Sequence, residues 1–119
     1  MTFNPATLRY NDQGLIPAVA QDATSGEVLM MAWMNAESVT RTLLTGNVTY
    51  WSRSRQAFWV KGESSGHVQK LVDFRVDCDR DCILVTVDQT GPACHTNRRS
   101  CFYTAVRDGA EVELMSPQE

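Results

Sequence analysis

Hydrophobic positions recur along the chain at two spacings, and the commoner one predicts strands. Residues 15–21 and 27–34 are apolar runs separated by the polar, glycine-containing segment 22–26, a pattern typical of a β-hairpin. Four later segments have the β-branched and aromatic content of strands: 48–53, 58–61, 67–76 and 82–88. One face of the last of these is expected to carry Ile83, Val85 and Val87. A final strand is expected late in the sheet, over 102–106.

Helical spacing replaces the strand pattern once, over about residues 36–44. Asn35 precedes this segment as an N-cap, and Gly46 follows it as a stop. Three apolar residues are expected together on one helix face: Val39, Leu43 and Leu44. One main helix among short strands predicts an α+β fold, with a largely antiparallel sheet in a small single domain over 1–119. The polar tail after about residue 107 is expected to be loose.

Composition and charge indicate a globular domain and give no sign of a nucleic-acid or membrane partner. Of the 119 residues, 43% are hydrophobic, which suits one globular domain with its own core. The net charge of −3 favours neither nucleic acid nor an anionic membrane as a partner. No basic segment followed by an apolar run begins the chain, and no apolar stretch approaches the ~18 residues that span a bilayer. A cytoplasmic location is therefore expected.

Three aspartates alternate along one short segment, at Asp77, Asp79 and Asp81. If the segment is extended, their side chains point to one face, with alternate Cα atoms about 6.5 Å apart. Carboxylates so close repel one another unless a cation lies between them, and oxygen ligands suit Mg²⁺. The alternative is a solvated acidic edge.

Three of the four cysteines predict a second, softer metal site. Cys78, Cys94 and Cys101 lie among carboxylates and a histidine, and such thiolates suit Zn²⁺. Two disulfides are the alternative, which fits secreted domains better than a chain without an export signal. Three protein ligands leave a fourth position for a water whose pKa the metal lowers to about 7. Cys82 is interpreted as a small core residue.

The alternation that gathers the aspartates also turns Cys78 away from them. The two metals therefore cannot be adjacent ligand sets on one surface of an extended segment. Either the chain twists sharply here, or a second subunit completes one site.

His95 directly follows a predicted zinc ligand, so it is the candidate general acid and base. A fourth ligand to zinc, or a hydrogen-bond donor to a ligand, is its alternative role.

Several long motifs in order resemble the phosphoribosyl-AMP cyclohydrolases, over about residues 15–107. The motifs are MAWMN (31–35), YWSRSR (50–55), WVKGESSGH (59–67) followed by Gln69, DCDRD (77–81) and QTGPACHTNRRSCFY (89–103). Asn97 stands where many family members have glycine. Because asparagine tolerates positive φ best among non-glycine residues, the loop between the two later cysteines is expected to keep its shape.

The resemblance implies an enzyme of histidine biosynthesis. A zinc-activated water would open the adenine ring of 1-(5-phosphoribosyl)-AMP at its C6–N1 bond and give the formimino imidazole carboxamide ribotide. The resemblance also implies that Mg²⁺ is bound by Asp77, Asp79 and Asp81, and that Zn²⁺ is bound by Cys78, Cys94 and Cys101. Cys78 would come from the other subunit of an intertwined homodimer.

A substrate with two phosphates needs cationic and hydroxyl donors, and the chain offers a row of them. The candidate phosphate ligands are Ser52, Arg53, Ser54, Arg55, Arg98 and Arg99. Further candidates for catalysis or substrate contact are Lys61, Glu63 and His67, although His67 varies among relatives. Trp51 and Trp59 are candidates for stacking on adenine or for the core. Any single arginine here can equally be a solvated surface cation.

Two other functions use the same residues. One is a zinc-dependent hydrolase or deaminase that acts on another purine ribotide. The other is a non-enzymatic module with a closed structural zinc site, which leaves the aspartates and the WSRSR segment without a role.

Overall fold

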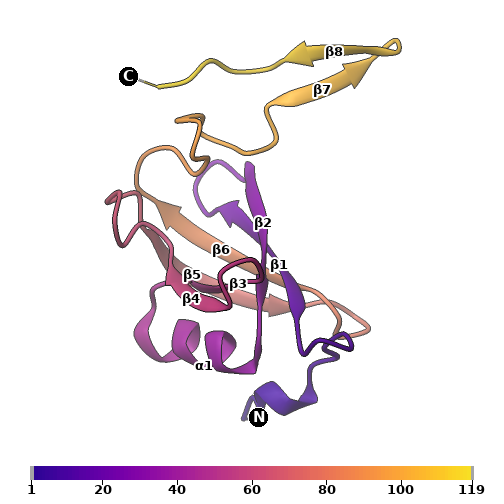
Figure 1. The fold of residues 1–119 in the computed structure, drawn as a ribbon, viewed down its shortest axis with the longest axis vertical. Coiled ribbons are helices and arrows are strands. Elements are labelled where there is room, and N and C mark those ends of the chain that lie inside the picture. The colour runs from indigo at the N-terminus through magenta and orange to yellow at the C-terminus, as the bar shows by residue number, and fades with distance from the viewer. Residues whose placement is uncertain (1, 119) are drawn as a thin grey trace.

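The computed structural model describes residues 2–118. In chain order the described elements are η1 (Pro5–Thr7), β1 (Ile16–Asp22), β2 (Val28–Met34), α1 (Ala36–Thr45), β3 (Thr49–Ser52), β4 (Ala57–Val60), β5 (Gln69–Val76), β6 (Ile83–Gln89), β7 (Thr104–Arg107) and β8 (Ala110–Glu113) (Figure 1). No helix among these residues has the length and apolar character needed to cross a membrane.

Four strands form the central sheet, in the order β2-β1-β6-β5. The β1–β2 and β5–β6 pairs are antiparallel, whereas β1 and β6 run parallel. β3 and β4 form a separate hairpin, which lies with α1 on one side of the sheet (Figure 1). The α+β class, the first hairpin and the mostly antiparallel pairing are therefore confirmed.

The core lies between the sheet and the α1–β3 layer. Alternate residues of β1 and β6 are buried, and those of β6 are the predicted Ile83, Val85 and Val87. The covering layer contributes Val39 from α1 and Tyr50 from β3, and both are fully buried. The period-two pattern of these strands thus determined which face of the sheet became the core.

The helix begins and ends where its caps predicted. The Asn35 side chain accepts a hydrogen bond from the backbone of Ser38, and Gly46 ends the helix with φ 75°. The predicted apolar face is wrong, because Leu43 and Leu44 are 39% and 83% exposed. Each residue of an α-helix turns the chain by about 100°, so Leu44, five residues after Val39, points in a very different direction. Val39 and Leu44 therefore cannot share one face.

The helix face that packs against β3 is instead partly polar. Ser38, Val39 and Thr42 are its buried residues. The Thr42 hydroxyl accepts a hydrogen bond from the Thr49 N–H at 2.9 Å and lies 3.3 Å from the Thr49 carbonyl oxygen. Because hydrogen bonds satisfy these hydroxyls, they can replace apolar side chains in the interior.

The tail expected to be loose contributes to a further β-hairpin, the β7–β8 arm, instead. β7 pairs with β8 in a two-stranded sheet of its own, and the strand expected over 102–106 does not join the central sheet. Figure 1 shows this arm standing away from the body. Its chain returns to the body where the Gln118 N–H donates to the Asn97 carbonyl at 2.7 Å. Backbone pairing therefore orders a polar segment that has no core of its own.

Candidate active site and metal centres

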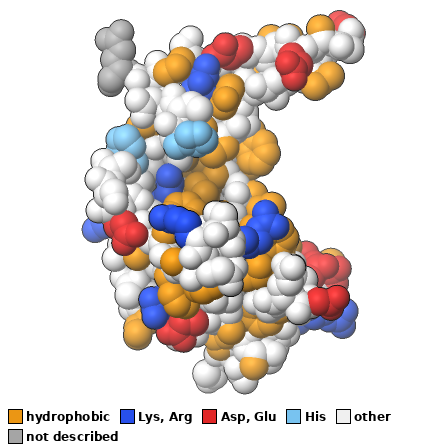
Figure 2. All heavy atoms as spheres, in the orientation of Figure 1, with side chains coloured by type: hydrophobic (Ala, Val, Ile, Leu, Met, Phe, Trp, Pro, Cys, Tyr) orange, Lys and Arg blue, Asp and Glu red, His pale blue; other side chains and the backbone are white. Residues whose placement is uncertain are grey.

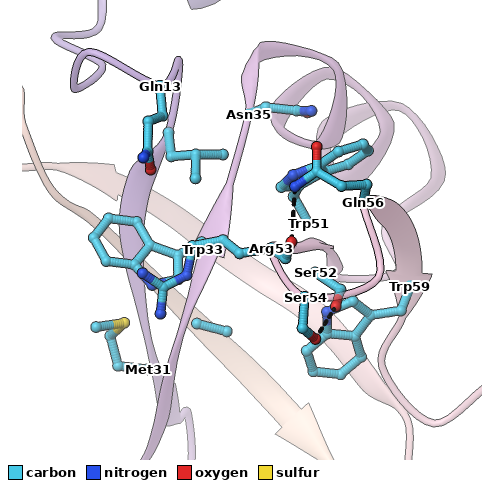
Figure 3. Close-up of a pocket in the computed structure, with 12 residues that line it drawn as sticks. Gln13, Met31, Trp33, Asn35, Trp51, Ser52, Arg53, Ser54, Gln56 and Trp59 are labelled. Atoms are coloured by element: carbon cyan, nitrogen blue, oxygen red, sulfur yellow. Dashed lines mark hydrogen bonds between the residues drawn. The ribbon is translucent and has the colours of Figure 1, made fainter.

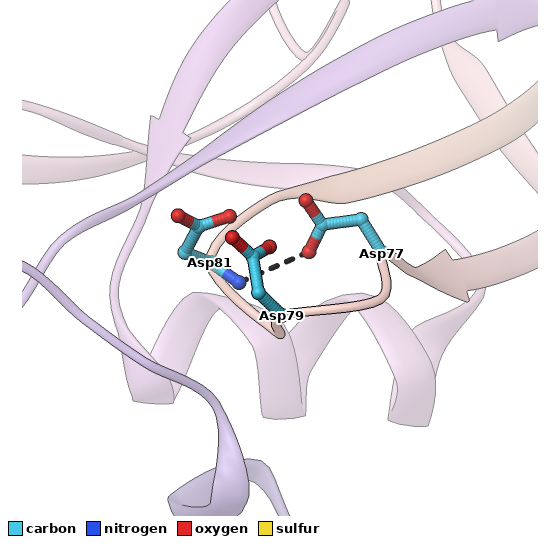
Figure 4. A group of neighbouring side chains, drawn as sticks. All are labelled: Asp77, Asp79 and Asp81. Atoms are coloured by element: carbon cyan, nitrogen blue, oxygen red, sulfur yellow. Dashed lines mark hydrogen bonds between the residues drawn. The ribbon is translucent and has the colours of Figure 1, made fainter.

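The acidic loop, residues 77–82, connects β5 to β6 by a tight turn. The Arg80 N–H donates to the Asp77 carbonyl at 3.1 Å, and Arg80 has φ 66°. The segment is therefore not extended, and the sharp turn is one of the two alternatives that the sequence left open. The turn still gathers the carboxylates of Asp77, Asp79 and Asp81, whose ligand atoms lie within 4.8 Å of one another (Figure 4). Within residues 2–118 this trio is the one cluster of three or more candidate metal ligands.

Hydrogen bonds from two directions hold the acidic loop in shape. From inside the loop, the Asp77 carboxylate accepts the N–H groups of Asp81 and Cys82 at 3.0 and 3.1 Å. From outside, the Arg80 guanidinium donates to the carbonyl and the hydroxyl of Thr7 at 3.1 and 2.6 Å. These contacts support the left-handed backbone at Arg80, which L-residues adopt at a cost.

The pKa values of Asp77 and Asp81 are shifted in opposite directions. The hydrogen bond with Asp79 is the largest cause of a raised pKa at Asp81, followed by desolvation and the hydrogen bond with Asp77. At Asp77 desolvation opposes ionisation, but the pKa is lowered because backbone and carboxyl donors together outweigh it. A cation bound among these carboxylates would favour their ionised form. Octahedral Mg²⁺ holds its oxygens roughly 3–4 Å apart, so this donor set fits a hard cation.

The cysteine loop, residues 94–101, follows β6 at the opposite end of the sheet. The Asn97 N–H donates to the Cys94 carbonyl at 3.0 Å, and Asn97 has φ 64°, the positive value expected there. The Cys101 N–H donates to the Leu29 carbonyl at 2.7 Å, which fixes the end of the loop to β2.

The thiols of Cys94 and Cys101 are neighbours and are not joined in a disulfide. Cys101 is exposed on the protomer surface, but desolvation by the protein around its thiol raises its pKa to about 11, and the adjacent Cys94 adds to the shift. Burial opposes ionisation at Cys94 too, but its pKa is lowered because the Thr96 hydroxyl donates to its sulfur at 3.0 Å and other donors surround it. The Cys101 thiol helps to lower the pKa of Cys94, whereas the Cys94 thiolate raises the pKa of Cys101, and a soft cation bound between the two sulfurs would favour the thiolate form of both.

Cys78 lies with the aspartates and does not join the other two cysteines within one protomer. β6 separates the acidic loop from the cysteine loop, and its seven residues at about 3.3 Å each span roughly 20 Å. The pKa of Cys82 is raised by burial, and its side chain is half-buried.

A groove of about 1060 Å³ lies between β2 and the turn that joins β3 to β4 (Figure 3). Its lining includes three tryptophans, Trp33, Trp51 and Trp59, and the polar turn residues Ser52, Arg53, Ser54 and Gln56. The Arg53 guanidinium lies 4.9 Å from the Trp33 ring centroid. The Ser52 and Ser54 hydroxyls are 3.4 Å apart, and the Arg55 N–H donates to the Ser52 hydroxyl. Three of the six predicted phosphate donors, Ser52, Arg53 and Ser54, therefore line a groove beside large aromatic surfaces, and a fourth, Arg55, adjoins them.

Lys61 connects this groove with the cysteine loop. Its ammonium lies 5.9 Å from the Trp59 ring centroid and donates to the Ala93 carbonyl at 2.6 Å, directly before Cys94. Burial lowers the pKa of Lys61, and the nearby thiolates of Cys101 and Cys94 oppose that shift.

The three other candidate proton carriers, His95, Glu63 and His67, differ in their exposure to solvent. His95 is exposed on the cysteine loop, and Glu63 is exposed in the turn closed by the Gly66 N–H and the Gly62 carbonyl. His67 is half-buried against Gly91, where a Cβ atom would lie 2.7 Å from the imidazole Cδ2. Figure 2 shows the histidines above a hollow that is edged by basic side chains.

Arg98 and Arg99 already have partners within the protomer. Arg98 donates to the Glu113 carboxylate and to the Met115 carbonyl, and it stacks 4.1 Å from the Tyr103 ring centroid. Arg99 pairs with Asp22 at 2.9 Å. Phosphate contact by either residue stays a prediction, and it would need these pairs to be shared or broken.

Sequence reasoning missed a buried polar pair beside the site. The fully buried Tyr50 hydroxyl donates to Gln69 Oε1 at 2.7 Å, and Gln69 Nε2 donates to the Met30 sulfur at 3.3 Å. Tyr50 is also close enough to Cys101 for that thiolate to raise its pKa, after the larger effect of burial. The sequence signal was the inward position of both residues in their strands, but nothing local showed that they meet.

Comparison with known proteins decides the family. A sequence model described as phosphoribosyl-AMP cyclohydrolase matches residues 30–103, which is more than half of the chain. The chain belongs to the phosphoribosyl-AMP cyclohydrolase family.

Curated relatives carry the same family name over their full lengths. Proteins named phosphoribosyl-AMP cyclohydrolase from Dinoroseobacter shibae and Ruegeria pomeroyi are 81% and 80% identical over 117 residues, which cover 98% of this chain and of each relative. The one from Paracoccus denitrificans is 76% identical over 116 residues, which cover 98% of this chain and 96% of the relative. The residues matched by the family model, 30–103, contain the turn that joins β3 to β4, the acidic loop and the cysteine loop. The expected family is confirmed, and this family is one of hydrolases.

Proposed function

We propose that the protein opens the adenine ring of phosphoribosyl-AMP by hydrolysis of its C6–N1 bond, as a step of histidine biosynthesis. The family supports this substrate, since the relatives are named for it. The observation that carries the proposal is the neighbouring pair of thiols, Cys94 and Cys101, which Lys61 links to a groove lined with tryptophan and arginine. Such a groove suits a flat base joined to phosphates.

Two metals have fitting donors. Cys94 and Cys101 would hold Zn²⁺ together with the partner's Cys78, and the aspartate trio would hold Mg²⁺. Bound zinc would supply a Lewis acid that lowers the pKa of water to about 7. The chain itself must place the substrate's C6 beside that position and move the protons.

A homodimer is part of the proposal because one protomer separates the ligands. The acidic loop and the cysteine loop lie at opposite ends of β6, roughly 20 Å apart. The projecting β7–β8 arm has the exposed apolar residues Val106 and Val112, and Phe102 and Leu114 flank it. An arm of this kind suits contact with a second copy, which would bring the two loops together.

The groove residues would bind and orient the substrate. Ser52, Arg53 and Ser54 supply hydroxyl and guanidinium donors for a phosphate, with Arg55 hydrogen-bonded to Ser52 beside them, and Trp33 supplies a flat surface for the base. Holding these two parts fixes the position of C6 and lowers the entropic cost of attack by water.

Proton transfer falls to the exposed His95. In the substrate, the ribosyl group on N1 leaves C6 amidine-like and electrophilic. As water adds to C6, a neutral His95 would take its proton and then donate a proton to N1 while the C6–N1 bond breaks. Lys61 holds the Ala93 carbonyl and so fixes the start of the cysteine loop.

The test is ring opening of phosphoribosyl-AMP by the purified protein, followed by ultraviolet absorbance. Chelation should abolish activity, and Zn²⁺ plus Mg²⁺ should restore it. Cys101→Ala should lose activity, while Cys82→Ala is the matched control and should keep most of it. A protein that binds zinc but converts no ribotide would support a structural zinc module, and conversion of a different purine ribotide alone would reassign the substrate.

A further inference from the structure

The cysteine loop is braced against the sheet by one side chain, that of Arg99. Its Nη1 donates to the Gly91 carbonyl at 2.9 Å and to the Gln89 carbonyl at 3.3 Å. Its Nη2 donates to the Asp22 carboxylate at 2.9 Å. The Arg99 guanidinium therefore links the end of β6 (Gln89) and the nearby Gly91 to the end of β1 (Asp22).

The carboxylate that receives Arg99 is itself held rigidly. Asp22 has a side chain only 8% exposed, and its second oxygen accepts the Ser25 N–H at 2.8 Å. The backbone of Asp22 donates to the Glu27 carbonyl, so the β1–β2 turn closes around it. The Ser25 N–H is the largest cause of the lowered pKa of Asp22; burial opposes it and Arg99 adds to it.

The backbone around Arg99 holds both cysteines. The Arg99 carbonyl accepts the Ala93 N–H, and the Arg98 carbonyl accepts the Cys94 N–H, both at 3.1 Å. Two residues after Arg99, the Cys101 N–H donates to β2. The backbone at Arg98 and Arg99 thus links the segment that carries Cys94 to the segment that carries Cys101.

We infer that Asp22 and Arg99 are positioning residues that fix the separation of the Cys94 and Cys101 sulfurs for a thiophilic metal. This inference rests on the proposed function, because it needs a metal at the cysteine pair. A tetrahedral ion tolerates little error in ligand spacing, so hydrogen-bonded partners behind the ligands affect metal affinity. The pair acts through the loop and does not touch the substrate.

This role differs from the phosphate contact predicted for Arg99 from the sequence. Three of its N–H groups are used by Gly91, Gln89 and Asp22, and its charge is balanced by a buried carboxylate. If Arg99 is a positioning residue, its substitution should leave KM for the ribotide unchanged. If it binds a phosphate of the substrate, its substitution should raise KM, so kinetics separate the two roles.

The experiment measures metal affinity in the full-length protein with Co²⁺ as the probe. Thiolate–Co²⁺ charge-transfer absorbance is titrated in wild type, Asp22→Asn and Arg99→Lys, and Zn²⁺ affinity is measured by competition with a chelating dye. Glu37→Gln is the matched control, because it makes the same carboxylate-to-amide change in an exposed arginine pair on α1. Thermal unfolding of each metal-free protein is recorded in parallel.

We expect Asp22→Asn and Arg99→Lys each to weaken metal binding roughly 10- to 100-fold, the range for such partners of metal ligands. The control should bind as wild type does. At saturating Zn²⁺, kcat should recover in both variants, with KM for the ribotide unchanged. If Asp22→Asn and Arg99→Lys keep the metal affinity of wild type and only unfold at a lower temperature, the positioning role is refuted and the proposed function stays intact. A raised KM in Arg99→Lys alone would return Arg99 to the phosphate site. A wild-type protein without metal affinity would overturn both proposals.

Discussion

The separation of the two loops in one protomer leads to a complementation experiment. Cys78→Ala and Cys101→Ala should each abolish the zinc site when made alone. If the partner's Cys78 completes each site, a mixed dimer of the two variants has one site with all three sulfurs intact. If all ligands come from one chain, the mixed dimer has none. The structure favours the first arrangement, because β6 holds the acidic loop and the cysteine loop roughly 20 Å apart.

The expected recovery follows from the symmetry of the dimer. Random exchange of two variants gives half mixed dimers, and each of these has one intact site of two, so about one quarter of all sites are active. The assay unfolds and refolds the variants together, adds Zn²⁺ and Mg²⁺, and measures both bound zinc and ring opening. A mixture of Cys94→Ala with Cys101→Ala is the control and should stay inactive, because both changes fall in the same half of the site. Failure of the first mixture to regain activity, with dimers present, would refute a ligand shared between subunits.

Other predictions test the core, the groove and the acidic loop. Tyr50→Phe should destabilise the fold by about 1–3 kcal/mol, because it leaves a buried Gln69 oxygen without its donor, and adding Gln69→Leu should recover part of that loss in thermal unfolding. Arg53→Met should raise KM for the ribotide roughly 10- to 100-fold with little change in kcat, as expected for one charged hydrogen bond, whereas Arg41→Met, which removes a similar arginine–aromatic contact on α1, should leave KM unchanged. Asp79→Ala should remove the dependence of activity on added Mg²⁺ along with most of the activity; a variant that keeps both would make the acidic loop a solvated turn.

Local signals in the sequence predicted much of the secondary structure. Asn35 and Gly46 cap α1 because capping depends on hydrogen bonds and φ angles within a few residues. Alternation alone identified the buried face of β6. The positive φ at Asn97 also followed from residue type. Each of these features is decided by neighbours along the chain.

The family and the candidate metal ligands also came from the sequence, because the motifs are long and their residue types are chemically specific. The alternate spacing of the three aspartates suggested that they cluster on one face of an extended segment, but the segment is a turn. The trio gathers because Arg80 adopts a left-handed turn that Thr7 supports from more than 70 residues away. Long-range contacts of this kind leave no periodic signal.

Only the tertiary structure decided which polar residues are committed to one another. Asp22 meets Arg99 and Tyr50 meets Gln69 across long stretches of chain; the first pair is partly buried and the second fully buried, because segments distant in sequence pack together. The sequence by itself determined the helix, most of the strands and the reactive side chains, since those depend on local geometry and residue chemistry, but it did not predict the β7–β8 hairpin. Their separation into two loops at opposite ends of β6 was decided by the fold, because strand order sets distances that spacing along a chain does not encode.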